Sequence, residues 1–351
     1  MHNHFITFDN HPFTCGLYGG SFNPPHLGHV RCILEAASCC RTLILVISSG
    51  SRRSEIDVRV RYRWIYRLTS HLAHVKLFIL EDDAGSKEAY TEEYWQRDAD
   101  KVKAFAGQPI DAVFCGSDYG EDSFWSRCYP QAQLIILPRN GMSSTELRAD
   151  IYGHWDWLPN VVKPYYVKIV LIIGGESTGK STLVKNLALA YNTCCVEEVG
   201  RDVTDFAGGE EWMIAEDFHQ ILLRHKVKEL DALKACSRVL FVDTDALTTR
   251  FYSRFLLCGE EEIRQCEALA DAITALNSYD LILFLEPTVE FVQDGTRNER
   301  IAADREKYSR QIKELFEQKG LSYVSLAGDY LERFYRAKLL IKEKLGLDTR
   351  W

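Results

Sequence analysis

Short apolar runs that alternate with helical patterns along the whole chain are the feature that most restricts its fold. In the first half these runs are residues 13–18, 43–48, 75–80, 112–115 and 133–137. In the second half they are residues 168–173, 196–199, 239–243, 281–285 and 323–326. Continuous apolar runs of this length are typical of strands that are buried on both faces of a parallel sheet. The pattern therefore predicts an α/β fold with two parallel-sheet domains, each with helices packed on its sheet.

The length of the chain and one break in its periodicity predict where the two domains meet. The chain has 351 residues, which favours two domains over a single core. The regular alternation stops at residues 155–164, which include Pro159 and Pro164. We therefore expect one domain at residues 1–150, a linker at 151–166 and a second domain at 167–351.

Composition excludes several classes of protein. The net charge of −8 does not favour a nucleic-acid-binding surface, and the apolar runs are too short to span a bilayer. The N-terminus lacks the basic and apolar regions of a signal peptide. The eleven cysteines include no C-x-x-C pair, which is typical of thiols in a reducing compartment. We expect a cytoplasmic protein that binds neither DNA nor a membrane.

The first apolar run leads into a glycine-rich turn with two histidines, at residues 19–29. Gly19 and Gly20 allow a ligand to approach the backbone closely. His26 and His29 would share one face of a helix that begins near His26. The start of such a helix binds anions because its free N–H groups and its dipole point there. The turn therefore predicts a phosphate site, although a tight turn with incidental histidines would show the same spacing.

A second short pattern, S-S-T-E-L-R at residues 143–148, follows the run 133–137. Ser144 or Thr145 would cap a helix and donate to phosphate oxygens, and Arg148 would neutralise them one turn later. Together the two patterns resemble the G-x-F-x-P-x-H-x-x-H and S-S-T-x-x-R signatures of the nucleotidyltransferase α/β-phosphodiesterase superfamily. The resemblance implies a Rossmann-like nucleotidylyltransferase domain at 1–150, with His26, His29 and Arg148 as its catalytic residues. It implies that ATP is bound by Gly20, Ser21, Phe22, His29, Gly116, Asp118, Ser143, Ser144, Thr145 and Arg148.

Three other features of the first half have alternative interpretations. Asp118 could accept hydrogen bonds from a ribose or be an ordinary loop carboxylate. Trp95 lies where nicotinamide mononucleotide adenylyltransferases carry an aromatic that stacks on the pyridine ring, although an aromatic there is often a core residue. An arginine series on a predicted helix could face a substrate phosphate or be solvated surface, and we favour solvated surface for most of its members; it comprises Arg59, Arg61, Arg63 and Arg67.

A complete G-x-x-x-x-G-K-[ST] pattern predicts the second phosphate site, between the run 168–173 and a helical pattern at 183–190. Backbone N–H groups of such a loop surround phosphates, catalytic Lys180 reaches the β- and γ-phosphate oxygens, and Ser181 ligates Mg²⁺. Asp243 ends a later apolar run, where it would hold the Mg²⁺ shell. The residues expected to bind ATP here are Gly174, Gly175, Glu176, Ser177, Thr178, Gly179, Lys180, Ser181 and Thr182.

Residues that bind the substrate are expected after this loop in the sequence. Residues 198–202 are expected to close the second strand of the half, at the mouth of the sheet. Arg201 and Asp202 would bind the substrate there. Asp202 would also be catalytic if it accepted the proton of the substrate hydroxyl, and Asp243 is the other candidate for this base.

A lid is expected after the fourth strand of the half. Residues 294–297, followed by Arg300 and Arg305, resemble the lid of small-molecule kinases. The resemblance implies that Arg297 binds ATP and that the lid cations stabilise the transferring phosphoryl group.

Over nearly its whole length the chain is similar to the NadR-type bifunctional nicotinamide mononucleotide adenylyltransferases and ribosylnicotinamide kinases. This resemblance implies that a kinase domain at 167–351 phosphorylates nicotinamide riboside with ATP and Mg²⁺. The first domain would then adenylylate nicotinamide mononucleotide with a second ATP to give NAD and pyrophosphate. Val199 departs from the aromatic that is common in this family, and Trp212 or Phe218 would have to replace it.

Several points stay open at the level of the sequence. Some members of the family carry an N-terminal helix-turn-helix domain, but few residues precede the first run here, so DNA binding is not expected. The same motifs would serve a nucleotidylyltransferase and kinase pair for another phosphorylated acceptor, or a nucleotide-sensing regulatory protein. The oligomeric state, a homo-oligomer included, and the preference for amidated or deamidated substrate are not determined.

Overall fold

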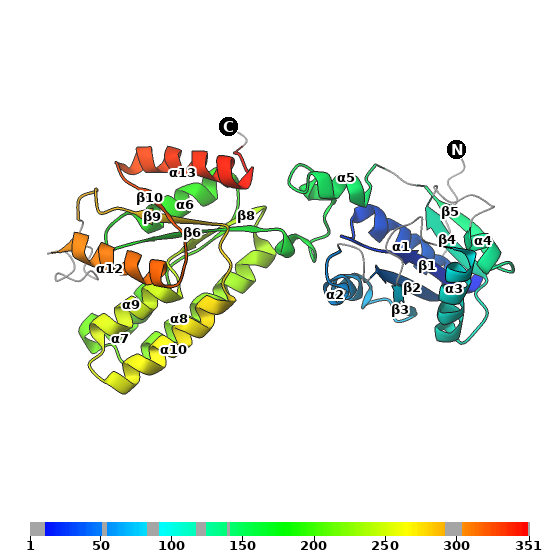
Figure 1. Cartoon of the computed structure of the whole chain (residues 1–351), viewed down its shortest axis with the longest axis horizontal. Helices are drawn as coiled ribbons and strands as arrows, with labels where there is room; N and C mark the ends of the chain where they lie inside the picture. Colours follow the sequence, from blue (N-terminus) through cyan, green and yellow to red (C-terminus); the bar gives the residue numbers. More distant parts are fainter. Residues whose placement is uncertain are drawn as a thin grey trace. The chain divides into compact units, whose positions relative to one another are not determined.

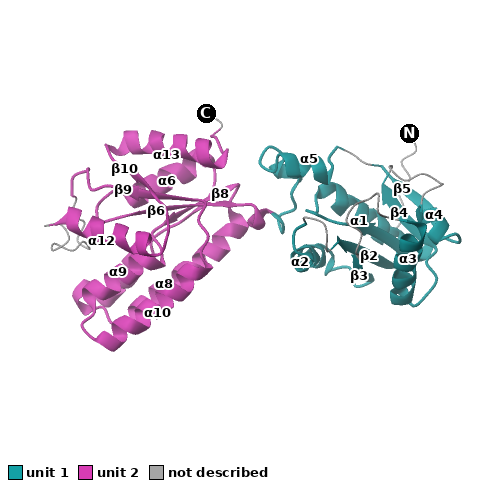
Figure 2. Ribbon diagram, viewed as in Figure 1, with its two compact units in different colours: residues 1–162 teal, residues 163–351 magenta. Residues whose placement is uncertain are grey.

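The chain divides into two compact units in a computed structural model that describes residues 11–50, 55–82, 91–116, 124–138, 141–291 and 304–349. The units are residues 1–162 and 163–351 (Figure 2). The division falls inside the segment 151–166 that the sequence predicts as the linker. Within the described residues each unit contains one five-stranded sheet with parallel strand pairs, which confirms the predicted fold class.

In the first unit strands and helices alternate along the chain (Figure 1). The strands are β1 (Phe13–Gly20), β2 (Cys40–Gly50), β3 (Val75–Asp82), β4 (Ala112–Gly116) and β5 (Gln133–Leu137). The helices are α1 (Leu27–Cys39), α2 (Val58–Thr69), α3 (Glu92–Ala106), α4 (Phe124–Cys128), α5 (Ser144–Ala149) and the 3₁₀ helix η2 (Trp155–Trp157). The strand order β3-β2-β1-β4-β5 places the turn after β1 where the strand order reverses, and parallel α/β sheets bind ligands there.

Both faces of the first sheet are buried, as its continuous apolar strands predict. Leu45 of β2 packs with Ile33 of α1 and Ile65 of α2 on one face. The next residue, Val46, points to the other face and packs with Val102 of α3. Because successive side chains of a strand alternate between faces, each strand contributes to both layers of the core.

The second unit repeats this architecture with a different strand order. Its strands are β6 (Lys168–Gly174), β7 (Cys195–Val196), β8 (Val239–Asp243), β9 (Leu281–Leu285) and β10 (Val324–Leu326), in the order β10-β9-β6-β8-β7. Its α-helices are α6 (Lys180–Tyr191), α7 (Gly200–Ala207), α8 (Ala215–Ala235), α9 (Ala246–Leu256), α10 (Glu260–Leu276), α12 (Arg305–Gln318) and α13 (Tyr330–Leu345). Its 3₁₀ helices include η3 (Lys163–Tyr165) and η4 (Glu210–Trp212). The turn after the central strand β6 again lies where the order reverses.

All predicted strands are present, but β7 is shorter than the predicted run 196–199. The reason is the environment of Val199, whose backbone is helical and which forms the N-cap of α7. Its side chain is fully buried in a cluster with Phe218 and Ile221 of α8. Burial against a helix, rather than in the sheet, accounts for the apolar character of this position.

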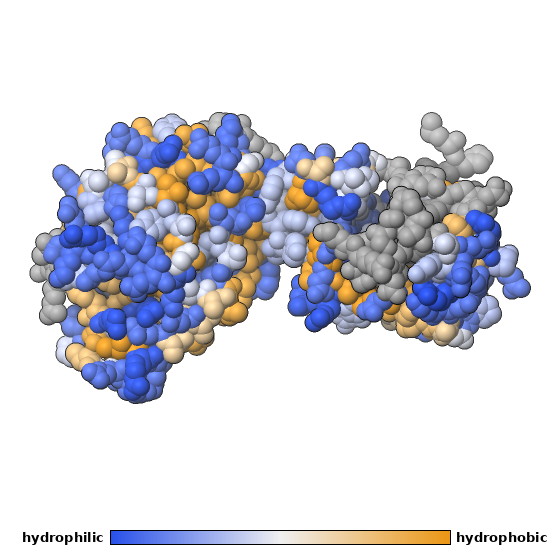
Figure 3. Space-filling model, viewed as in Figure 1, coloured by the Kyte–Doolittle hydropathy of each residue, from blue (hydrophilic) through white to orange (hydrophobic). Residues whose placement is uncertain are grey.

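The face of the described residues that Figure 3 shows is largely polar. Hydrophilic residues cover much of the visible face of both units in Figure 3, with smaller apolar areas between them. Of the helices in the described ranges, none is both long and apolar enough to cross a membrane.

The predicted linker contains buried apolar side chains. Trp155 and Leu158 are only 3% and 1% exposed, and Trp157 lies close to Gly141 of the first unit. These contacts extend the first unit beyond residue 150.

A comparison of two fragments tests this extension. We expect the fragment 1–162 to be more stable than the fragment 1–150, because truncation removes Trp155 and Leu158 from the core. Each such side chain contributes about 1.5–3 kcal/mol, so the thermal midpoint should fall by roughly 5 °C or more. Circular dichroism melting of the two fragments measures the difference, and equal midpoints would contradict the assignment.

Candidate active sites

The turn between β1 and α1 brings the two predicted histidines together. His26 is the N-cap of α1, and its backbone N–H donates to Nδ1 of His29 over 3.2 Å. The centroids of the two rings are 3.9 Å apart. A Cβ on Gly28 would lie 2.9 Å from the His26 ring, so only glycine lets this ring fold back over the helix. The imidazoles thus lie at the positive end of the α1 dipole, where anions bind favourably.

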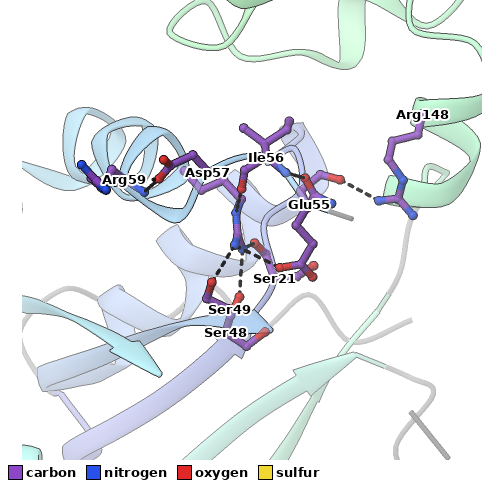
Figure 4. A network of polar contacts seen from close by, with 10 residues as sticks. Ser21, Ser48, Ser49, Glu55, Ile56, Asp57, Arg59 and Arg148 are labelled. Carbon is purple, nitrogen blue, oxygen red and sulfur yellow. Dashed lines mark hydrogen bonds and ion pairs between the residues drawn. The ribbon is translucent and has the colours of Figure 1, made fainter. Parts of the chain in front are cut away.

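The second sequence pattern packs directly on this turn. Nη1 of Arg148 in α5 donates to the carbonyl oxygen of Asn23 over 2.6 Å (Figure 4). The hydroxyl of Ser144 lies 3.5 Å from the carbonyl oxygen of Pro24. These contacts join residues 125 and 120 positions apart in the sequence. The structure therefore assembles the two signatures into one site.

The cap of α5 differs from the prediction. Ser144 or Thr145 was expected to cap the helix, but Ser143 is the N-cap and its hydroxyl accepts from the Glu146 N–H. Glu146 in turn accepts from the Ser143 N–H over 2.8 Å. A reciprocal capping box of this kind stabilises the start of a helix. Ser144 and Thr145 consequently occupy the first turn, and the Thr145 hydroxyl accepts from Nη2 of Arg148.

Three of the four α2 arginines are exposed, as the interpretation of a mostly solvated series expects, and Arg61 is the exception. Its side chain is only 1% exposed and forms an ion pair with Glu55 at 3.0 Å. It also donates to backbone carbonyl oxygens of Ser21, in the turn, and of Ser48, in β2 (Figure 4). A buried guanidinium is tolerated only when such partners satisfy it. Arg61 therefore fixes the turn to the end of β2.

A signal for the burial of Arg61 exists in the sequence. Arg61, Trp64 and Ile65 are three and four residues apart, and all three are buried on one face of α2. This spacing identifies the face of a helix that points to the core.

Trp95 belongs to an aromatic cluster that borders the same turn. Its ring is stacked on Phe124 with a centroid distance of 5.2 Å and meets Trp125 edge-on at 5.5 Å. A Cβ on Gly19 would lie 3.2 Å from the Trp125 ring, so the cluster reaches the end of β1. Its role as a platform for a pyridine ring stays a prediction. Gly116 ends β4 next to β1, whereas Asp118 lies outside the described residues.

In the second unit the predicted phosphate loop connects β6 to α6. Nζ of Lys180 donates to the carbonyl oxygen of Gly175 over 3.0 Å, and the Thr178 hydroxyl donates to the same oxygen over 2.8 Å. Gly179 has a φ of 85°, and a Cβ there would lie 2.7 Å from the Tyr330 ring. These contacts curl the loop around the Lys180 ammonium at the start of α6, the geometry of a phosphate-binding loop.

Two arginines donate hydrogen bonds to backbone carbonyl oxygens of this loop. Arg333 of α13 is 1% exposed, and its guanidinium donates to the carbonyl oxygens of Thr178 and Glu286. Arg305 of α12 donates to the carbonyl oxygen of Ser177 over 3.1 Å. Arg333 was not identified from the sequence, because its partners are distant in the chain. Arg297 and the other residues of the predicted lid between 292 and 303 lie outside the described residues.

Ser181 and Asp243, the predicted Mg²⁺ ligands, lie in contact. The Ser181 hydroxyl donates to Oδ2 of Asp243 over 2.5 Å, and Asp243 is 1% exposed. Oδ1 of Asp243 has no hydrogen-bond partner among the described residues. Burial and the nearby charge of Glu198 raise the pKa of Asp243 to about 6. A hydroxyl and an unsatisfied carboxylate oxygen fit a hard divalent cation such as Mg²⁺, whose charge would favour the ionised carboxylate.

A cavity of about 250 Å³ opens beside the phosphate loop. Lys180, Glu198 and Arg201 are among its lining residues. Asp202, predicted to be catalytic, is not among them: its side chain is 64% exposed and lies 4.0 Å from Lys228. Glu198 was not proposed for a role from the sequence, although it precedes Arg201 by three residues and is the last residue but one of the expected strand 196–199.

The two aromatic candidates near Val199 have different environments. Phe218 is buried and lines the cavity, together with Val199 itself. Trp212 is 68% exposed and does not line it. Of the two candidates, Phe218 is thus the one that lines the cavity.

Comparison with known proteins agrees with this division. Residues 17–150 match the cytidylyltransferase-like family, and residues 169–333 match the AAA domain family. The trifunctional NAD biosynthesis/regulator protein NadR of Escherichia coli (strain K12) is 27% identical over 97% of this chain and 86% of the relative. The chain is a homologue of NadR. NadR of Salmonella typhimurium (strain LT2) is 26% identical over the same shares.

Solved structures of NadR share the fold of the chain. A crystal structure of NadR in complex with NR superposes with a TM-score of 0.81 at 22% identity, over 96% of this chain and 98% of that one. A second, in complex with NAD and AMP-PNP, gives a TM-score of 0.78 at 21% identity over the same shares. The similarity to NadR thus extends over both units.

The network around Arg61 predicts a large effect on stability. Replacement Arg61→Met leaves Glu55 and three backbone carbonyl groups without their buried partner. We expect the free energy of unfolding of the first unit to fall by ~3–5 kcal/mol, measured by urea unfolding. Arg59→Met is the matched control on the same helix, because the Arg59 side chain is 87% exposed. The control should stay within about 0.5 kcal/mol of the wild type, and equal effects of the two replacements would refute the role of Arg61.

Proposed function

We propose that the chain makes NAD from nicotinamide riboside in two ATP-dependent steps, one in each unit. The observation that carries the proposal is that one homologue of NadR has two separate turns of the kind that binds phosphate. One site joins His26, His29 and Arg148 at the turn after β1, and the other holds Lys180 in the loop after β6. The ligand names of the NadR structures, NR, NAD and AMP-PNP, support the same substrates for this chain.

In the first unit the proposed reaction is adenylyl transfer. The 5′-phosphate of nicotinamide mononucleotide attacks the α-phosphorus of ATP. The bond between this phosphorus and the oxygen that bridges it to the β-phosphorus breaks, and pyrophosphate leaves. His26, His29 and the start of α1 would bind the triphosphate, and Arg148 would neutralise the charge that develops on it. Preorganised donors of this kind lower the barrier without a covalent intermediate.

In the second unit the proposed reaction is phosphoryl transfer. The 5′-hydroxyl of nicotinamide riboside attacks the γ-phosphorus of ATP, and ADP leaves. Lys180 and the backbone N–H groups of the loop would bind the β- and γ-phosphates. Ser181 and Asp243 would hold Mg²⁺, which neutralises phosphate charge when it is bound.

The base of this step is better assigned to Glu198 than to Asp202. A base must reach the hydroxyl that it deprotonates. Glu198 lines the same cavity as Lys180, whereas Asp202 does not line it and faces Lys228. Asp243 is in contact with Ser181, so we assign it to the metal.

Two other functions use the same sites. A nucleotidylyltransferase and kinase pair for another phosphorylated acceptor would transfer phosphate but produce no NAD. A nucleotide-sensing regulator would bind ATP or NAD without turnover. A turnover assay with nicotinamide riboside and Mg·ATP separates both from the proposed enzyme.

Single replacements should separate the two steps. Lys180→Ala removes the cation at the β- and γ-phosphates, so conversion of nicotinamide riboside to its mononucleotide should fall by ~10²–10³. The same variant should still convert nicotinamide mononucleotide to NAD, because Lys180 lies in the other unit. His29→Ala should do the reverse and accumulate the mononucleotide. Chromatography of the products measures both, and loss of both steps in folded Lys180→Ala would contradict the assignment of one step to each unit.

Neighbouring carboxylates test the assignment of the base. Glu198→Gln should lower kcat of the kinase step by ~10²–10⁴ with a small change in KM for ATP, because the replacement removes a proton acceptor. Asp202→Asn is the matched control and should retain most of the activity. If Asp202→Asn is the more damaging replacement, the base lies outside the cavity lining described above.

A further inference from the structure

The cavity beside the phosphate loop is lined in part by threonines, and several of their hydroxyls are already hydrogen-bonded within the protein. Thr248 and Thr249 of α9 both line it. The Thr248 hydroxyl donates to Oδ1 of Asp245, and the Thr249 hydroxyl donates to the backbone carbonyl oxygen of Asp245, each over 3.2 Å. The hydroxyl of Thr178 is bound to the phosphate loop in the same way. Hydroxyls occupied like this stabilise the wall of the cavity and are not available to a ligand.

Thr244 lines the same cavity, but its hydroxyl is not occupied. Its backbone N–H donates to the carbonyl oxygen of Ile172 over 3.0 Å. The side-chain hydroxyl, in contrast, has no hydrogen bond to any described residue and is not enclosed. It is therefore open to a molecule in the cavity.

The backbone of Thr244 also indicates a functional position. Its φ of 64° lies in the left-handed region, which is rare for a β-branched residue. Such conformations cluster at active sites, where the surrounding structure holds them in place. Thr244 joins Asp243, which we assign to the metal, to Asp245, which caps α9. The left-handed turn thus lies next to the proposed site of phosphoryl transfer.

His225 of α8 contacts this turn from the other side of the cavity wall. Its Nε2 donates to the carbonyl oxygen of Asp243, the residue before Thr244, over 3.2 Å. Because a carbonyl oxygen only accepts, the hydrogen of the neutral ring is on Nε2, and Nδ1 is left as an acceptor. Nδ1 has no hydrogen-bond partner among the described residues and is not enclosed, and the ring lines the cavity. His225 and Thr244 thus meet at one peptide group, and each has an unoccupied hydrogen-bonding atom.

The position of this pair selects which part of a substrate it can contact. The carboxylate of Asp243 is bound to Ser181, and both are assigned to Mg²⁺. In a riboside the reacting 5′-hydroxyl is attached to the sugar, so the sugar lies closer to the transferred phosphoryl group than the base does. The sugar is therefore the part of the substrate nearest to Asp243. Its remaining polar groups are the 2′- and 3′-hydroxyls, which both donate and accept hydrogen bonds.

We propose that Thr244 and His225 bind a ring hydroxyl of the substrate's sugar and are specificity-determining residues of the kinase step. The sugar hydroxyl donates to Nδ1 of His225 and accepts from the Thr244 hydroxyl. A deoxy sugar leaves both groups unpaired beside a bound ligand, and unpaired buried groups of this kind discriminate strongly against an analogue that lacks a hydroxyl. This inference deepens the proposed kinase function and rests on it.

Deoxy analogues combined with single replacements test the contact. The substrates are nicotinamide riboside and its 2′-deoxy and 3′-deoxy analogues. For the wild type, kcat/KM should be at least ~10-fold lower for one of the two analogues than for the riboside. Thr244→Val removes the hydroxyl but keeps the β-branch and nearly the same volume. It should lower kcat/KM for the riboside by ~10-fold, mainly through KM, and leave the value for that analogue nearly unchanged.

Two replacements of His225 separate the contact with the substrate from the contact with Asp243. His225→Gln places an amide near the position of Nε2, so it can still donate to the Asp243 carbonyl but lacks Nδ1. It should show the same pattern as Thr244→Val. His225→Asn places an amide near the position of Nδ1 and should recover part of the preference for the full riboside. Circular dichroism melting checks that each variant is folded.

A matched control and a binding measurement complete the test. Thr249→Val removes a hydroxyl that is already bound to Asp245, so it should leave the ratio of kcat/KM between riboside and analogues as in the wild type. Equal losses for all three substrates in folded Thr244→Val, or equal use of the three by the wild type, would overturn the proposal. Isothermal titration of each compound without ATP separates the two claims. Binding that favours the full riboside without turnover rejects the kinase function alone, whereas turnover of all three at equal kcat/KM rejects the recognition of the hydroxyl alone.

Discussion

Guanidinium groups that hold backbone carbonyl oxygens are the interaction on which both phosphate turns depend. In the first unit Arg61 binds the carbonyl of Ser21, and Arg148 binds that of Asn23. In the second unit Arg305 and Arg333 bind two consecutive carbonyls of the loop, those of Ser177 and Thr178. A carbonyl held in this way fixes the plane of its peptide group, and so also the direction of the N–H on the same plane. Because anions bind to N–H groups, the arginines that hold these carbonyls also fix the directions of N–H groups in the two turns.

The parallel sheets explain why this arrangement occurs twice on unrelated sequence patterns. β1 and β6 are each flanked by strands on both sides, so the turn after each strand lies at the centre of the carboxyl edge of its sheet. The helix that follows starts at that edge with free N–H groups. Glycine residues and a histidine pair complete one turn, and a lysine completes the other. The fold thus supplies the position and the dipole, whereas the side chains determine the chemistry.

Local patterns in the sequence predicted the strands and the two turns, because a buried parallel strand and a glycine-rich turn each require particular residues over a short span. Interactions between segments that are distant in the sequence could not be predicted from such local patterns. Arg61 looked like one of several surface arginines, yet it is buried because Ser21, Ser48 and Glu55 surround it. Asp202 and Glu198 are similar carboxylates near the end of the same expected strand, but only Glu198 lines the cavity. The two carboxylates differ because β7 ends early and α7 starts at Gly200. The packing of Val199 on α8 fixes both the end of β7 and the start of α7.

The positions of these arginines along the chain have a consequence for biosynthesis. Arg148 lies near the end of the first unit, and Arg333 lies in α13, the last helix of the second. During translation the glycine-rich turn of each unit leaves the ribosome well before the arginine that fixes its carbonyls. N-terminal domains generally fold first as a chain is made. The first nucleotide site would therefore be completed while the second unit is still being synthesised, and the second site only after α13 has been synthesised.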